Sequence, residues 1–86
     1  MSDNLLEFPC SFPIKIMGLD EPGLRELAVD LVSRYAGDIA DEAVRTSRSK
    51  SGKYLSVTIT IEAQSQNQLD RIYRDLTEHD RVKVVL

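Results

Sequence analysis

The residue most able to carry out acid–base chemistry is the only histidine of the chain, His79. An imidazole titrates near neutral pH and could serve as a general acid or base. No cysteine, serine or second histidine stands at a spacing that indicates a nucleophile pair or a metal site with it. His79 lies at the end of an expected helix, which favours a partly exposed cation that meets the helix dipole.

The only cysteine, Cys10, is the second candidate. A reactive thiol needs nearby cations or a helix N-terminus, and neither is visible beside Cys10 in the sequence. The chain also lacks a Cys-x-x-Cys motif, so we interpret this thiol as inert. A lone cysteine cannot form an internal disulfide, which is typical of a reducing compartment.

Two pairs of adjacent carboxylates, Asp20-Glu21 and Asp41-Glu42, could in principle move protons or bind cations. Neighbours in sequence usually point apart, and no metal-ligand spacing accompanies them. We interpret them as turn and surface residues. The sequence therefore predicts no catalytic residue, metal ligand or cofactor, and the chain is not expected to be an enzyme.

A basic segment, residues 45–53, is the best candidate for recognition. It holds Arg45, Arg48, Lys50 and Lys53 and no acid, whereas the rest of the chain has seven of the 11 basic residues and all 14 acidic ones. Cations, hydroxyls and exposed amides together suit an anion or a carboxylate-rich partner. The alternative is a solvated hairpin whose charges discourage pairing at a sheet edge.

The overall composition narrows the classes of partner and the compartment. A net charge of −3 argues against broad binding to nucleic acids or anionic membranes. No apolar run approaches the ~20 residues that span a bilayer. Residues 1–4 are polar and lack the basic and apolar regions of a signal peptide. We expect a cytoplasmic protein without membrane contact.

The first half of the chain reads as a strand followed by a helix. Apolar residues alternate over 12–17, the period of a half-buried strand. Asp20 is the expected N-cap of the helix, with Pro22 in its first turn, and the helix should end near Gly37. Its apolar stripe comprises Leu24, Leu27, Ala28, Leu31, Val32 and Tyr35.

The second half repeats the pattern with an added hairpin. A short strand is expected at 44–46, a turn at 50–53 and a long alternating strand at 54–61. Residues 65–68 form a capping box that opens a helix with Leu69, Ile72, Tyr73 and Leu76 on one face. In the closing strand we expect Val82, Val84 and Leu86 to face the core, with Lys83 and Val85 on the other side.

The order β-α-β-β-α-β with right-handed crossovers predicts an α+β fold. It is the ferredoxin-like plait, a four-stranded antiparallel sheet with two helices on one face. Residues 11–86 are expected to form this single domain, and residues 1–10 an extension that packs on it. The open face should carry Lys15, Met17, Tyr54, Ser56, Thr58, Thr60, Lys83 and Val85. One tyrosine on this face is a poor platform for stacking bases, so RNA binding is not favoured.

Several segments spread over almost the whole length of the chain match one family pattern. They are Leu5–Pro9, Phe12, Lys15–Gly18, Ser49–Tyr54, Ser56–Thr60, Tyr73, Leu76 and Val84–Leu86. In these segments the sequence resembles the YbeD-like family of small bacterial proteins. This resemblance implies the ferredoxin-like fold and a cytosolic bacterial protein, and it supplies no active site.

A shorter segment, Asp20–Leu24, is similar to the Asp-x-Pro-Gly turn of ACT domains, regulatory modules that bind amino acids. In ACT domains this turn meets a neighbouring subunit and frames the ligand site. The same residues also make a good generic helix start. The resemblance implies a ligand site framed by Gly18, Asp20 and Gly23.

Two functional hypotheses follow from these observations. The first is a non-catalytic regulatory or adaptor domain that contacts another protein through the open sheet face and the basic segment. The second is an ACT-like sensor of an amino acid or a small metabolite anion, which requires the chain to self-associate. The sequence does not identify the protein partner, and it leaves homodimer formation open.

Overall fold

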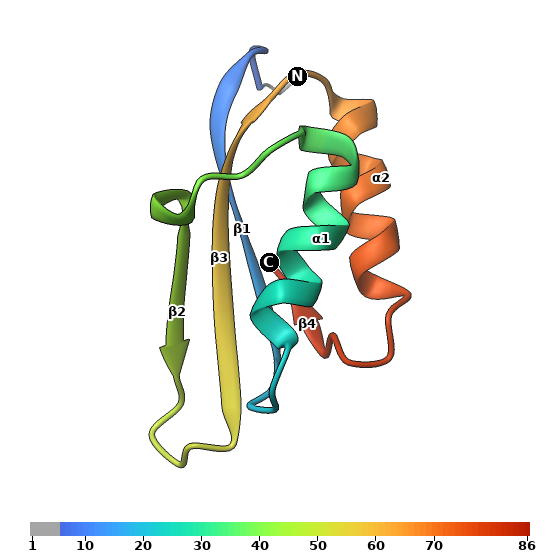
Figure 1. Cartoon of the computed structure of the whole chain (residues 1–86). Coiled ribbons are helices and arrows are strands. Elements are labelled where there is room, and N and C mark those ends of the chain that lie inside the picture. Colours follow the sequence, from blue (N-terminus) through green and yellow to red (C-terminus); the bar gives the residue numbers. More distant parts are fainter. Residues whose placement is uncertain (1–5) are drawn as a thin grey trace.

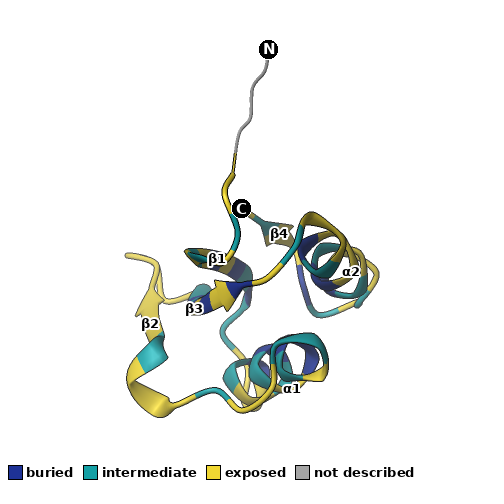
Figure 2. Ribbon diagram, turned by 90° about the horizontal axis from the view of Figure 1, so that it is seen from above, coloured by how far each residue is buried: buried dark blue, intermediate teal, exposed yellow. Residues whose placement is uncertain are grey.

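The structure is a computed structural model that describes residues 6–86. Its sheet has the strand order β2-β3-β1-β4, and every pairing in it is antiparallel. Both helices cover the same face of the sheet (Figures 1 and 2). The predicted ferredoxin-like plait is therefore confirmed. The elements are β1 (Cys10–Leu19), α1 (Leu24–Ala36), the 3₁₀ turn η1 (Asp41–Ala43), β2 (Val44–Arg48), β3 (Tyr54–Ala63), α2 (Gln66–Thr77) and β4 (Val84–Val85).

The core lies between the central strands and the helices. Ile14 is opposite Ile59 and Ile16 is opposite Val57, and none of the four has any exposed area. Burying a side chain of this kind stabilises the fold by about 1.5–3 kcal/mol. The other buried members are Leu24, Ala28, Leu31, Val32, Ile61, Ala63, Leu69, Ile72, Leu76 and Val82.

The start of α1 differs from the prediction. Its N-cap is Gly23, at a φ of 92°, and no side chain caps the helix. Glycine suits this position because a positive φ costs it little. The prediction that Asp20 is the N-cap was wrong, since its carboxylate binds Arg48 instead. A cation from a distant hairpin outcompetes the local amides, and no local pattern shows this.

The start of α2 agrees with half of the predicted capping box. Ser65 Oγ accepts from the N–H of Gln68 at 3.1 Å. The Gln68 side chain, however, accepts from the N–H of Gln64 at 2.7 Å and not from that of Ser65. Its amide nitrogen donates to the carbonyl of Tyr35 at 3.0 Å. Gln68 thus ties the start of α2 to the end of α1.

The closing strand is shorter than predicted, and its side chains face differently. Val85 is opposite Ile16 and packs against the core, whereas Val84 is opposite Met17 on the open face. Val84 is 43% exposed and Leu86 is 66% exposed. Val82 is buried as expected but precedes β4, so the alternation does not run through from Val82. The side chains of β4 therefore alternate one residue out of step with the prediction.

The N-terminal extension expected at residues 1–10 is described only in part. Residues 1–5, and Leu5 with them, lie outside the described residues. Leu6 is 48% exposed, Phe8 packs partly buried against the core, and β1 begins at Cys10.

Gly18 provides a test of the close packing beneath β1. A Cβ at this position would overlap the carbonyl oxygen of Arg81 and lie 3.1 Å from a methyl group of Leu24. We expect Gly18→Ala to lower the free energy of unfolding by about 1–3 kcal/mol, because backbone must move. Ser56→Ala on the neighbouring strand is the control and should cost less than ~1 kcal/mol. Equal effects of the two in urea denaturation would contradict this account.

Tyr35 provides a test of the contact between the helices. Its hydroxyl donates to the carboxylate of Asp75 on α2 at 2.5 Å. This bond, more than burial, raises the pKa of Tyr35 above its ordinary value. A raised folded-state pKa means that the contact stabilises the fold below a pH of about 10 and that this stabilisation is lost as the pH rises through the folded-state pKa.

Asp75→Asn should therefore lower the pKa of Tyr35, measured by carbon NMR of the ring as the pH is raised. Tyr73 is the internal control, because burial alone raises its pKa. A Tyr35 titration that does not move in the variant would show that Asp75 is not the cause.

Candidate functional site

The two contact regions predicted from sequence lie side by side at one end of the sheet. The β2–β3 hairpin and the β1–α1 turn meet there (Figure 1). The N–H of Asp20 donates to the carbonyl of Lys53 at 2.9 Å, and Arg48 Nε donates to the Asp20 carboxylate at 2.5 Å. The two functional hypotheses from the sequence used the turn and the hairpin separately. In the fold, these two bonds join them.

The ion pair borders a pocket of about 420 Å³ formed by the β1–α1 turn, the first turn of α1 and Arg48. The side chain of Asp20 is 18% exposed and that of Arg48 is 71% exposed. Glu21 is held from the other side, with its carboxylate 3.9 Å from Nε of Arg81. Charges of both signs line the pocket.

The residues predicted to frame a ligand have different positions. Asp20 and Gly23 line the pocket. Gly18 does not, because it is buried in β1 beneath the carbonyl of Arg81 and the side chain of Leu24. Gly18 therefore serves close packing in this structure, and the other two are the only members of the predicted set that reach this pocket.

The four basic residues of the hairpin face different ways. Arg45 is opposite Thr58 and shares the open sheet face with it, whereas Arg48 reaches back to Asp20. Lys50 is exposed in the turn, and Nζ of Lys53 lies 5.4 Å from the centre of the Tyr54 ring. The cations thus surround the hairpin instead of converging on one point.

Two hydroxyls of the hairpin turn, those of Ser49 and Ser51, are engaged within it. Ser49 Oγ accepts from the N–H of Tyr54 at 3.1 Å, and Ser51 Oγ accepts from the N–H of Lys53 at 3.3 Å. The two hydroxyls lie 3.2 Å apart. These bonds shape the turn, so these two hydroxyls already have partners within it.

The open face has a polar middle and two unlike edges. Of the predicted residues, Lys15 on β1 lies opposite Thr58 on β3. Tyr54, Ser56 and Thr60 on β3 share the same face. The β2 edge is basic. The β4 edge is apolar, with Met17 beside Val84. The sequence missed this apolar edge because it assigned Val84 to the core.

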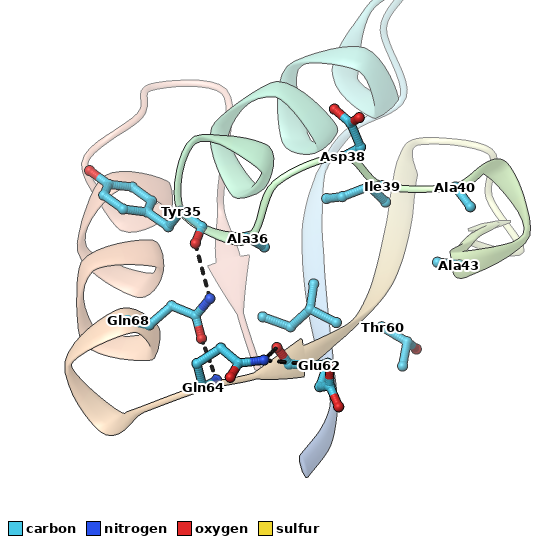
Figure 3. Close-up of a pocket in the computed structure, with 11 residues that line it drawn as sticks. Tyr35, Ala36, Asp38, Ile39, Ala40, Ala43, Thr60, Glu62, Gln64 and Gln68 are labelled. Atoms are coloured by element: carbon cyan, nitrogen blue, oxygen red, sulfur yellow. Dashed lines mark hydrogen bonds between the residues drawn. The ribbon is translucent and has the colours of Figure 1, made fainter. Parts of the chain in front are cut away.

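A second pocket lies where β3 extends beyond β2. The pairing of β2 ends at Val44 opposite Ile59, while β3 continues to Ala63. The chain from α1 to η1 passes this free end and leaves a pocket of about 320 Å³ (Figure 3). Gln68 bridges its base through the two bonds described above. The sequence gave no signal of this pocket beyond the shortness of β2.

The two remaining candidates from the sequence are His79 and Cys10. Nδ1 of His79 accepts from the N–H of Arg81 at 3.2 Å. Cys10 is a half-buried free thiol. Within residues 6–86, no group of three or more histidine, cysteine or acidic residues is placed to hold a metal ion. Among the same residues, no helix has the length and apolar character to cross a membrane.

Comparison with solved structures supports the fold. Protein HP0495 from H. pylori, solved in solution, superposes with a TM-score of 0.77 over 98% of this chain and 88% of its own. Its sequence is 15% identical, so the likeness concerns the fold.

Comparison with known sequences identifies the family. A model described as a protein of unknown function (DUF493) matches residues 3–86. A UPF0250 protein of Paraburkholderia phytofirmans is 45% identical over 100% of this chain and 97% of its own length. The UPF0250 protein NE1487 of Nitrosomonas europaea is 42% identical over 98% of this chain and 97% of its own. The chain therefore belongs to the DUF493 family, which includes the UPF0250 proteins, and the resemblance to YbeD-like proteins is confirmed.

Proposed function

We propose that this chain is a non-catalytic regulatory or adaptor domain that binds another protein through its open sheet face and the β2–β3 hairpin. The observation that carries the proposal is the bare face of the sheet. Both helices lie on the opposite face, so no helix or strand of residues 6–86 forms a layer over this side (Figure 2). A sheet face with an apolar edge and a charged edge has the mixed character of protein interfaces.

Charge supports a particular kind of partner. The segment 43–61, which contains β2 and most of β3, has four cations and no acid. The rest of the protein has an excess of seven negative charges, since seven basic residues face 14 acidic ones there. A partner with acidic residues would be attracted to this side and repelled by the others.

The β4 edge supplies the apolar part of the surface. Val84 and Leu86 are two of the three large apolar residues classed as exposed within residues 6–86. Met17 lies beside Val84 in the register. Removing such a cluster from water favours association by about 25 cal/mol for each Å² of apolar area. The basic edge would then orient the partner while the apolar edge adds affinity.

A photo-reactive amino acid placed in the open face tests the proposal in cells. At Thr58 it should give discrete crosslinks to another protein, because Thr58 lies in the centre of the face. At Glu26, which is exposed on α1, it should give none of the same products. Adding Arg45→Glu should remove the Thr58 products, since the charge that attracts the partner is reversed.

The controls separate the alternatives. Arg34→Glu on α1 changes the net charge equally but far from the open face, so it should leave the products unchanged. Identical products from Thr58 and Glu26 would contradict the proposal, as would none from Thr58. Products that contain only this chain would show homodimer formation through the same face.

A second candidate function is an ACT-like sensor of an amino acid or a small metabolite anion. It is favoured by the pocket at the β1–α1 turn, where Arg48 is held by Asp20. A ligand carboxylate would compete with Asp20 for the guanidinium.

Titration of isotopically labelled protein with individual amino acids tests the sensor. We expect saturable amide shifts at Asp20–Leu24 and Arg48, together with an increase in oligomer size. Arg48→Gln should weaken binding by about tenfold, because a charge-assisted hydrogen bond to the ligand is lost. Arg45→Gln, on the other face of the same strand, is the control. A spectrum that stays unchanged with every amino acid tested would rule out an amino-acid sensor.

A further inference from the structure

The outer edge of β2 has backbone groups that no strand within residues 6–86 pairs with. The N–H of Ser49 donates to the carbonyl of Tyr54, which fixes this pair as hydrogen-bonded across the hairpin. Hydrogen-bonded pairs alternate along an antiparallel ladder. Arg45 and Ser47 therefore bond to β3, and the peptide groups of Thr46 point away from the sheet. Among residues 6–86 there is no strand beyond β2 in the sheet order.

We propose that an extended acidic segment of a partner protein adds to this edge as a fifth strand, antiparallel or parallel to β2. This inference rests on the proposed function and names how and with what chemistry the partner binds. Strand addition gives affinity through main-chain hydrogen bonds and specificity through alternate side chains. The edge is accessible, because four of its five residues are exposed.

Charge favours an acidic segment as the occupant of this edge. Two antiparallel β2 strands centred on Thr46 would place Arg45 opposite Ser47 and Arg48 opposite Val44, so neither arginine would gain an opposite charge directly across the pair. Opposite charges across a strand pair are stabilising. Because the hairpin has four cations and no acid, an acidic segment would supply the charges that a second β2 lacks.

The register further defines the segment. Arg45 lies on the open face, and no carboxylate among residues 6–86 forms an ion pair with it. Arg48 lies toward the helices and is already held by Asp20. Acidic residues should therefore occupy every second position of the added strand, so that their side chains lie on the same face of the sheet as Arg45.

Proline at position 46 separates strand addition from simple charge attraction. Thr46→Pro removes an N–H that points away from β3, so no bond of the existing ladder is lost. Thr46→Val keeps that N–H and is the matched control. Both variants should retain the amide NMR spectrum of the folded domain away from β2, which verifies the fold before binding is measured.

The probe is a short capped peptide in which glutamate alternates with valine, added to labelled protein at low salt. We expect amide shifts confined to Val44–Lys53, weaker binding as salt rises, and no binding of a peptide with lysine in place of glutamate. Thr46→Pro should weaken binding at least about tenfold. A carbonyl of the added strand would lose the N–H of residue 46 as its hydrogen-bond donor, and the proline ring would obstruct the strand. Thr46→Val should bind as the unchanged protein does.

Three results would overturn strand addition. The first is equal binding by Thr46→Pro, and the second is equal binding of the lysine peptide. The third is stronger shifts of the same amides by an oligouridine, with binding that Thr46→Pro does not change. That result would indicate phosphate recognition. If any of these occurs while the crosslinks at Thr58 persist, the adaptor function stands without strand addition. If the crosslinks also fail, both proposals fall.

Discussion

The antiparallel pairing of β1 with β3 is the constraint on which the other elements depend. It runs through ten residue pairs, from Cys10 opposite Ala63 to Leu19 opposite Tyr54. This register turns every second side chain toward the helices, so Ile14 and Ile59 are sealed while Lys15 faces outward. A slip of one residue would exchange the two faces, which burial of the core forbids. The open face exists because the same pairing that fills one side leaves polar residues on the other.

The unequal lengths of the strands generate the features that could recognise a partner. The two central strands have ten residues each, whereas β2 has five and β4 has two. β2 therefore covers only one end of β3. At that end it presents a free basic edge, and at the other the uncovered end of β3 borders a pocket beside η1. Short edge strands also limit indiscriminate pairing, and at the β2 edge the cations add selectivity through charge.

Sequence periodicity predicted the plait and most of the core, because strand and helix periods follow directly from backbone geometry. It failed where partners distant in sequence decide. Asp20 looks like a helix cap until the fold brings Arg48 to it, and Gly18 looks like part of a ligand site until Arg81 packs over it. Just before β4, the buried Val82 is followed by a shift of phase that alternation cannot reveal. The basic segment was recognised from its composition, but its free backbone groups depend on which side of β2 bonds to β3.

The bond between Arg48 and Asp20 gives the β2 edge a definite chemical character. It directs one of the four cations toward the helix side and holds the hairpin against the β1–α1 turn. Arg45 is left on the open side, where an incoming carboxylate would meet a charge that is not already compensated by Asp20. Specificity is a difference between affinities. The cations lower the free energy of pairing with an acidic strand, whereas a second β2 strand would place no carboxylate opposite Arg45 or Arg48, so the same residues that attract an acidic partner distinguish it from a copy of this chain.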